Sequence, residues 1–188
     1  MPASRGSQTV HIGQGSTIES LNVSELPRPG ELGQAVYLPN NRAYQIVQCD
    51  SGATAATAVG VVAAGDLAFW MAKGTGANPY RVTNDVVQAL GAADATNDNK
   101  RNNVAGVFTH AVTAGNYCVI QQRGRRNVAS DGGGDFTVGD YAIPGNTSAA
   151  DIDRMVAGTA PTHTIVGMVA GAEAAGFTSI DLDLPVVP

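Results

Sequence analysis

Turn-forming residues divide this sequence into short apolar runs, and this division limits the folds that the chain can adopt. The 188 residues include 23 Gly and 9 Pro, and the segments between them are rich in Val, Ala and Thr. Short apolar runs bounded by turn residues are typical of β-strands. The sequence therefore predicts an all-β fold, a small barrel or sandwich of short antiparallel strands with at most one or two short helices.

The low charge of the chain predicts that much of its surface is covered. Only 14% of the residues are charged, against roughly a quarter in an average soluble domain. A chain with so few charges is expected to bury surface against copies of itself or against a larger partner. The net charge of -5 argues against a nucleic-acid-binding protein, which usually presents a basic face.

The sequence predicts neither a membrane span nor a signal peptide. The most apolar stretch, residues 57–72, is interrupted by Gly60, Gly65 and Asp66, so it is too broken to cross a bilayer. The first residues lack the apolar stretch of a signal peptide. We therefore expect synthesis and assembly in a cytoplasm.

The chain is expected to divide into an extended N-terminal arm, residues 1–33, and a β-barrel or sandwich domain, residues 34–188. The arm is polar, and its Val10, His11 and Ile12 form an alternating segment with no obvious hairpin partner nearby. Such a segment is a candidate for strand addition to another subunit.

Within the domain, local patterns predict a hairpin and a helix. Residues 35–38 and 44–47 flank a Pro-Asn-Asn turn at 39–41, which indicates a β-hairpin. Ser148 is placed as the N-cap of a helix over residues 149–157.

Near the C-terminus, residues 178–184 alternate between apolar and polar side chains. This pattern predicts a strand that buries Ile180, Leu182 and Leu184. Asp181 and Asp183 are then expected on the solvent-exposed face of an edge strand.

The sequence contains no recognisable catalytic or metal-binding motif. The three histidines are far apart, and Cys49 and Cys118 lie in apparent strands, which predicts buried free thiols. The acidic loops 94–103 and 131–135 lack an EF-hand pattern or a third ligand and are interpreted as solvated turns. We therefore predict a protein that is not an enzyme and carries no cofactor.

Two features are candidates for partner binding. Arg123, Arg125 and Arg126 form the sharpest basic cluster; it could contact an acidic partner, contact phosphate, or lie at a solvated hairpin end. Trp70 stands between Phe69 and Met71, so bulky groups point to both faces of a strand. One face then meets a partner, or both are buried within one sandwich.

Several segments resemble the head decoration, or cement, proteins of tailed bacteriophages. The resemblance lies in the polar arm and in residues 59–70, 104–117, 138–144 and 166–184, and it covers most of residues 34–184. It is a likeness of pattern, so no functional residue is carried over. It implies a structural protein that decorates and stabilises the outer surface of a phage capsid by bridging neighbouring capsid subunits.

The resemblance also implies the partners and the location. The expected partner is the major capsid protein, and the chain is expected to form homo-oligomers, a trimer in preference to a dimer. It would assemble in the host cytoplasm and reside on the capsid surface. The alternatives are a tail tube or baseplate subunit and a carbohydrate-binding or adhesion module.

Overall fold

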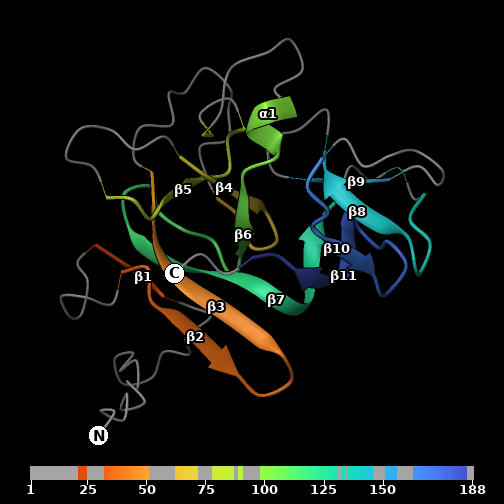
Figure 1. Ribbon diagram of the computed structural model, residues 1–188, viewed down its shortest axis with the longest axis horizontal. Coiled ribbons are helices and arrows are strands. Elements are labelled where there is room, and N and C mark those ends of the chain that lie inside the picture. Colours follow the sequence, from red (N-terminus) through yellow and green to blue (C-terminus); the bar gives the residue numbers. More distant parts are fainter. Residues whose placement is uncertain are drawn as a thin grey trace, which may run out of the picture.

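The computed structural model of the protein is built almost entirely from β-strands (Figure 1). It describes residues 21–24, 32–50, 62–71, 78–86, 89–90, 98–130, 133, 135–145, 151–155 and 163–185. These residues form eleven strands and one helical turn, α1 (Asp98–Arg101). The all-β prediction is confirmed.

The hairpin predicted around residues 39–41 is present. Strand β2 (Ala35–Leu38) pairs antiparallel with β3 (Arg42–Cys49), in the register Leu38 opposite Arg42. Asn40 and Asn41 both have positive φ, 69° and 58°. Two such residues make the turn whose twist matches that of the strands, and Asn tolerates this conformation better than most residues. The hairpin projects from the body of the molecule, at the bottom of Figure 1.

Five strands close into a barrel. Each pairs with the next, and the last pairs again with β3. All neighbours are antiparallel except β3 and β5, which are parallel. In spatial order the strands are β3, β5 (Arg81–Thr83), β4 (Leu67–Trp70), β6 (Val104–Phe108) and β7 (Tyr117–Ala129).

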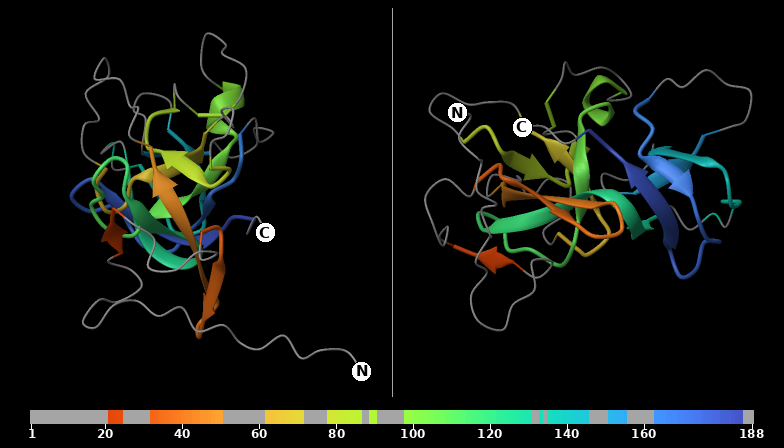
Figure 2. Two further views of the ribbon diagram at one scale, coloured as in Figure 1. Left: turned by 90° about the vertical axis from the view of Figure 1, so that its left-hand side faces the viewer. Right: turned by 60° about the horizontal axis from the view of Figure 1, so that its bottom comes forward.

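Strand β7 continues beyond the barrel, and the part of the same sheet that it carries there is called the flanking sheet. Its 13 residues pair with β3 and β6 in their first half and with β11 in their second half. The flanking strands extend from β7 to one side of the barrel (Figure 2). In order they are β11 (Phe177–Asp183), β10 (Gly167–Val169), β8 (Tyr141–Pro144) and β9 (Ile152–Arg154). A further strand, β1 (Asn22–Val23), pairs with the beginning of β7.

Strands β4 and β6 separate two apolar cores. Leu67 and Phe69 belong to a cluster beneath the flanking sheet, whereas Ala68 and Trp70 contact a second cluster. That second cluster includes Val47 and the other inward-facing residues of the barrel. Because both faces of β4 are covered by the chain itself, its alternating side chains serve two cores. This corresponds to the sandwich-like alternative for the run around Trp70.

A bulge and a glycine redirect β7 where it leaves the barrel. Ala43 lies opposite Arg123 and Tyr44 opposite Gln121, so Gln122 is the extra residue of a β-bulge. Two residues later, Gly124 has a φ of 85°, which a residue with a Cβ adopts only at a cost. These irregularities let one strand serve both sheets.

The helix predicted for residues 149–157 is wrong in its described part. Ile152–Arg154 form β9, with Ala142 opposite Arg154 and Pro144 opposite Ile152. Ile152 is fully buried in the core beneath the flanking sheet. Burial and pairing with β8 outweigh a helix propensity that is weak in any short segment.

Candidate functional site

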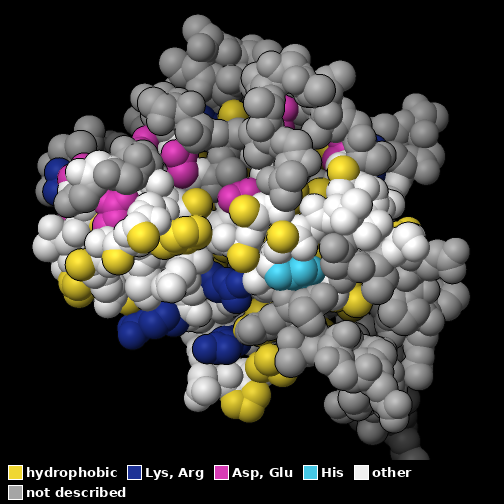
Figure 3. Space-filling model, turned by 180° about the vertical axis from the view of Figure 1, so that it is seen from behind, with side chains coloured by type: hydrophobic (Ala, Val, Ile, Leu, Met, Phe, Trp, Pro, Cys, Tyr) yellow, Lys and Arg dark blue, Asp and Glu magenta, His cyan; other side chains and the backbone are white. Residues whose placement is uncertain are grey.

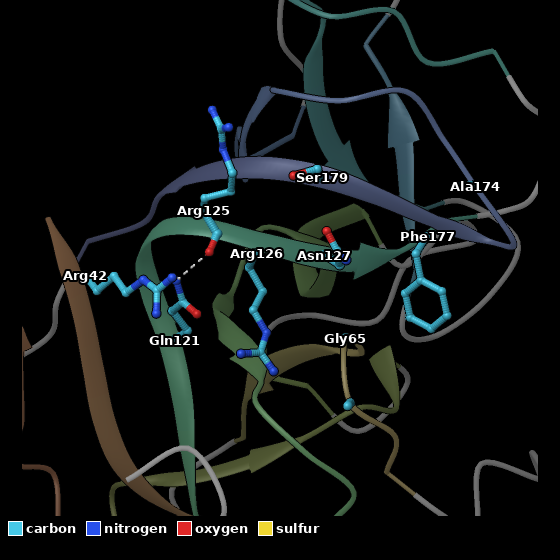
Figure 4. Close-up of a pocket in the computed structure, with 10 residues that line it drawn as sticks. Arg42, Gly65, Gln121, Arg125, Arg126, Asn127, Ala174, Phe177 and Ser179 are labelled. Carbon is cyan, nitrogen blue, oxygen red and sulfur yellow. Dashed lines mark hydrogen bonds between the residues drawn. The ribbon is translucent and has the colours of Figure 1, made fainter. Parts of the chain in front are cut away.

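A basic pocket of about 600 Å³ opens where β7 passes from the barrel to the flanking sheet. Its residues come from β3, from β7, from β11 and the turn before it, and from the turn that precedes β4 (Figure 4). None of the described residues that line it is Asp or Glu. The lining residues are Arg42, Ala64, Gly65, Gln121, Arg125, Arg126, Asn127, Ala174, Phe177 and Ser179.

Arg42 reaches the pocket because β7 has no side chain at position 124. A Cβ added to Gly124 would lie 2.9 Å from Cγ of Arg42 and 3.2 Å from the carbonyl oxygen of Asn41. The aliphatic stem of Arg42 therefore lies directly against the β7 backbone. Gly124 is needed here both for its positive φ and for this close approach.

Arg126 and Arg125 point to opposite faces of β7, as neighbours on a strand do. Arg126 lies opposite the buried Ile180, and its Nη2 donates a hydrogen bond to the carbonyl oxygen of Thr109. In Figure 4 its guanidinium extends toward Gly65, whereas that of Arg125 points the other way.

Arg125 forms a two-pronged ion pair with Asp181, which lies opposite it on β11. Its Nε and Nη2 donate to the two carboxylate oxygens, each at 3.1 Å. The hydrogen bond and the charge of Arg125 lower the pKa of Asp181, and Asp181 raises the pKa of Arg125. Arg125 therefore contributes mainly its backbone to the pocket, and its guanidinium is paired with Asp181 outside the pocket.

Gln121 holds the backbone of β7 in its bent course. The side chain is almost fully buried, and its Nε2 donates to the carbonyl oxygens of Arg123, at 2.9 Å, and Arg125, at 3.3 Å. These bonds fix the backbone on both sides of Gly124, so the arginines that follow start from a defined position.

The turn at residues 63–66 forms the wall facing β11. Gly65 has a φ of 95°, and a Cβ there would lie 2.8 Å from Cε1 of Phe177. Its carbonyl oxygen accepts a hydrogen bond from the Ala129 amide at 2.9 Å. Asp66 stabilises the turn by accepting bonds from the Ala63 amide and from Asn84 Nδ2, both at 2.9 Å. Burial raises the pKa of Asp66, although these bonds oppose the shift.

The predicted basic cluster is divided by the structure. Arg125 and Arg126 line the pocket and Arg123 does not; Nε of Arg123 lies 3.6 Å from Oδ1 of Asp183. The cluster is not a hairpin end, because it lies within β7, and β11 is not an edge strand, because β10 follows it. Asp181 and Asp183 thus pair with arginines on the neighbouring strand instead of simply facing water.

The other predicted contact residues fall elsewhere. Trp70 is partly buried and packs against the barrel core. Val10, His11 and Ile12 lie outside the described residues. Their roles in partner binding remain predictions.

Eight of the ten pocket residues were not predicted from the sequence, and three of these, Ala64, Gly65 and Ala174, lie in turns. Arg42, Gln121, Asn127, Phe177 and Ser179 come from three strands that meet only after folding. One local signal was present: a glycine inside an arginine run marks a point where a backbone or side chain approaches closely.

The two cysteines are buried free thiols, as predicted. Burial, and to a lesser extent the charge of Asp50, raises the pKa of Cys49 to about 11. Burial also raises the pKa of Cys118 strongly. Both are therefore protonated at neutral pH, the form that is a poor nucleophile.

The described residues contain no group of three or more His, Cys, Asp or Glu placed to bind a metal ion. Within the same part of the chain, no helix has the length and apolarity needed to cross a membrane. The loops 94–103 and 131–135 are described only in part, so their interpretation as solvated turns stays a prediction. No protein-family model matches the chain, and comparisons with curated proteins and with solved structures give no match.

Proposed function

We propose that this protein is a structural component of a phage virion that binds the outer surface of the capsid and bridges neighbouring capsid subunits. The observation that supports this proposal best is a pair of exposed apolar surfaces at opposite ends of the described strand order. Each surface would be stabilised by burial against another protein. A domain with two separate binding surfaces can hold two neighbours at once.

The first surface lies on the projecting hairpin and is called the hairpin surface. Its apolar side chains are Tyr37, which is 65% exposed, and Leu38, and as neighbours on a strand they point to opposite faces of the hairpin. Both lie on β2, the strand at one end of the described order. Such a strand offers backbone hydrogen-bonding groups as well as side chains to a partner.

The second surface lies on the flanking sheet and is called the flank surface. Tyr141 on β8 lies directly opposite Met168 on β10, and both are nearly half exposed. Val138, which is 64% exposed, lies close by, since the Gly139 amide bonds to the carbonyl oxygen of Val169. Seen from behind, hydrophobic groups at the left and at the bottom of the molecule are separated by basic side chains (Figure 3).

The first test is the copy number in purified virions, measured by quantitative mass spectrometry. Hundreds of copies, released from intact heads by mild treatment, are expected for a capsid decoration protein. A handful of copies would assign the protein to the tail or baseplate instead. Complete absence would overturn the virion proposal.

The second test removes each apolar surface separately. Tyr37→Ser with Leu38→Ser, and Tyr141→Ser with Met168→Ser, should each weaken attachment to capsids in co-sedimentation while leaving the fold intact. The matched control is Leu90→Ser, because Leu90 is also an exposed apolar residue, 42% exposed, but belongs to neither surface. Equal binding by both double variants and the control would contradict the bridging proposal.

The proposal includes the N-terminal arm and self-association. Deletion of residues 1–15 is expected to weaken attachment while the barrel remains folded; unchanged affinity would exclude the arm. Association into trimers is tested by light scattering of the purified protein, and a monomer at all concentrations would contradict it.

A further inference from the structure

We propose that the basic pocket binds a carboxylate side chain presented by an extended acidic segment of a protein partner. This inference rests on the proposed function, because the partner is then a capsid subunit. The pocket would recognise a charged group of that partner, which the apolar surfaces do not do. The pocket would fix the position of the protein on its partner, while the two surfaces provide most of the buried area.

The sign of the charge in the pocket is opposite to that of the chain. The net charge is -5, yet the described lining contains three arginines and no acidic residue. Asp181 matches the charge of Arg125. Arg42 and Arg126 bring two more guanidiniums to the pocket. A planar guanidinium with five N–H donors suits a carboxylate, which can accept two parallel bonds from it.

Both of these arginines are held in place before any partner arrives. The stem of Arg42 lies against Gly124, and Nη2 of Arg126 is anchored by the carbonyl oxygen of Thr109. Immobilising long side chains in advance reduces the entropy lost on binding. The positioning is stronger for Arg126, which is half-buried, than for Arg42, which is exposed beyond its stem.

The remaining walls fit a peptide better than a free anion. Phe177, Ala64 and Ala174 supply apolar contacts, whereas Asn127 and Ser179 supply polar groups. Phe177 is 40% exposed, so its ring is available to the aliphatic part of a side chain. A volume of about 600 Å³ is much larger than one carboxylate and leaves room for neighbouring residues of a segment.

The surroundings of the pocket disfavour nucleic acid. Asp181 and Asp183 lie on the exposed side of β11. Glu173, in the turn before β11, accepts a hydrogen bond from Ser130 Oγ at 2.6 Å. A nucleic acid needs an extended basic track for its many regularly spaced phosphates. These carboxylates interrupt any such track, whereas a peptide needs to place only one carboxylate in the pocket.

The test is a titration of the ¹⁵N-labelled protein, followed by NMR at the amides of Gly65 and Asn127 and at Nε of Arg126. The probes are a capped pentapeptide with two central glutamates, the same peptide with glutamines, and inorganic phosphate. The glutamate peptide should shift these signals, and the glutamine peptide should not. We expect Arg126→Gln and Arg42→Gln each to weaken binding of the glutamate peptide about tenfold.

Arg123→Gln is the matched control, because it removes the same charge from the same strand outside the pocket and should leave the affinity nearly unchanged. Asn127→Asp is a second variant that adds a carboxylate at an exposed lining position without changing shape, and it should also weaken binding. Thermal unfolding of each variant shows that the fold is retained.

The outcomes that overturn the inference are distinct from those that overturn the proposed function. Equal binding of both peptides, a response to phosphate alone, or equal losses in Arg126→Gln and Arg123→Gln would exclude an acidic-peptide pocket. Capsid co-sedimentation is run in parallel. If the wild type binds capsids and Arg126→Gln binds equally well, the inference fails alone; if the wild type does not bind capsids, the proposed function fails.

Discussion

The closed barrel and the flanking sheet share β7, and each contains an arginine–aspartate ion pair, but the two pairs differ in burial. In the barrel, Arg81 on β5 pairs with Asp50, which is almost fully buried at the end of β3. In the flanking sheet, Arg125 pairs with Asp181 at the solvent-exposed face. Removing one partner of a buried pair leaves an uncompensated charge, whereas an exposed pair contributes little. The stability of the barrel is therefore expected to depend on its Arg81–Asp50 pair, whereas that of the flanking sheet should depend little on Arg125–Asp181.

The largest expected effect is in the barrel. Arg81→Gln leaves Asp50 buried without its cation and should reduce the free energy of unfolding by about 3 kcal/mol, the lower end for a broken buried pair. Urea denaturation measures the loss. Adding Asp50→Asn to the same chain should recover much of it, because the buried charge is then gone. A loss of the same size in the double variant would show that the packing of Arg81, and not the buried charge of Asp50, accounts for the loss of stability.

A smaller and local effect is expected from Gly167→Ala in the flanking sheet. A Cβ at Gly167 would overlap the carbonyl oxygen of Asp181 and lie 2.7 Å from Cγ2 of Ile180. The strain should cost about 1–3 kcal/mol and separate β10 from β11. Hydrogen exchange should then accelerate at the amides of Ala170 and Asp183, which bond to the carbonyl oxygens of Ser179 and Val166, but not at β3 amides.

Gly106→Ala is the matched substitution in the barrel. A Cβ there would lie 2.8 Å from the carbonyl oxygen of Gln121, and the exchange of barrel amides should accelerate. If both variants changed exchange everywhere, the two sheets would be one cooperative unit.

The pH dependence should differ in sign between Asp66 and Asp181. Burial raises the folded-state pKa of Asp66 above the ordinary 3.8, so its stabilising contribution is complete below that value and is lost as pH rises through the raised pKa. Arg125 lowers the pKa of Asp181, so that contribution is present above the ordinary pKa and is lost as pH falls through the lowered one.

Urea midpoints of two variants measured across acidic pH test this difference. Relative to the wild type, Asp66→Asn should gain stability as pH rises toward neutrality, because the variant keeps an oxygen acceptor and carries no buried charge. Asp181→Asn should lose stability, relative to the wild type, over the same change. Parallel curves for the two variants would contradict the assignment.

The smallest effect is expected from Arg125→Gln. The Arg125 side chain is 62% exposed and that of Asp181 is 44% exposed, and exposed pairs are screened by water and salt. The urea midpoint should not change measurably, in contrast to that of Arg81→Gln. A loss comparable to that of Arg81→Gln would show that the flanking sheet relies on its surface ion pairs.

The parts of the fold that local chemistry determines could be predicted from the sequence. The paired asparagines specify the β2–β3 turn, and the alternation ending at Leu184 identifies β11 and its buried face. Pairing between distant strands could not be predicted in this way. Because β9 pairs with β8, the segment expected to be a helix is a strand, and because β11 pairs with β7, Asp181 lies beside Arg125.

The candidate site was predictable only in part for the same reason. The arginine run was visible in the sequence, and a solvated hairpin end was one of three interpretations of it, but the run lies in the middle of a strand. Arg42 joins the pocket only because β3 and β7 pair, and Phe177 only because β11 pairs with the far half of β7. The glycine at position 124 marks a close approach, but no local pattern identifies Arg42 or Phe177 as a pocket residue.

The position of β7 also determines the order in which the chain can complete its structure during synthesis. Its first half can pair with β1, β3 and β6 as soon as it is made, but residues 123–129 wait for β11, which follows about fifty residues later. During that interval this half of the strand is an unpaired edge, the kind that joins another chain by mistake. Arginines at 123, 125 and 126 make such an edge repel its own copies. Two of these arginines, Arg125 and Arg126, line the pocket of the finished protein, so the same charges are expected to serve a second purpose in the nascent chain.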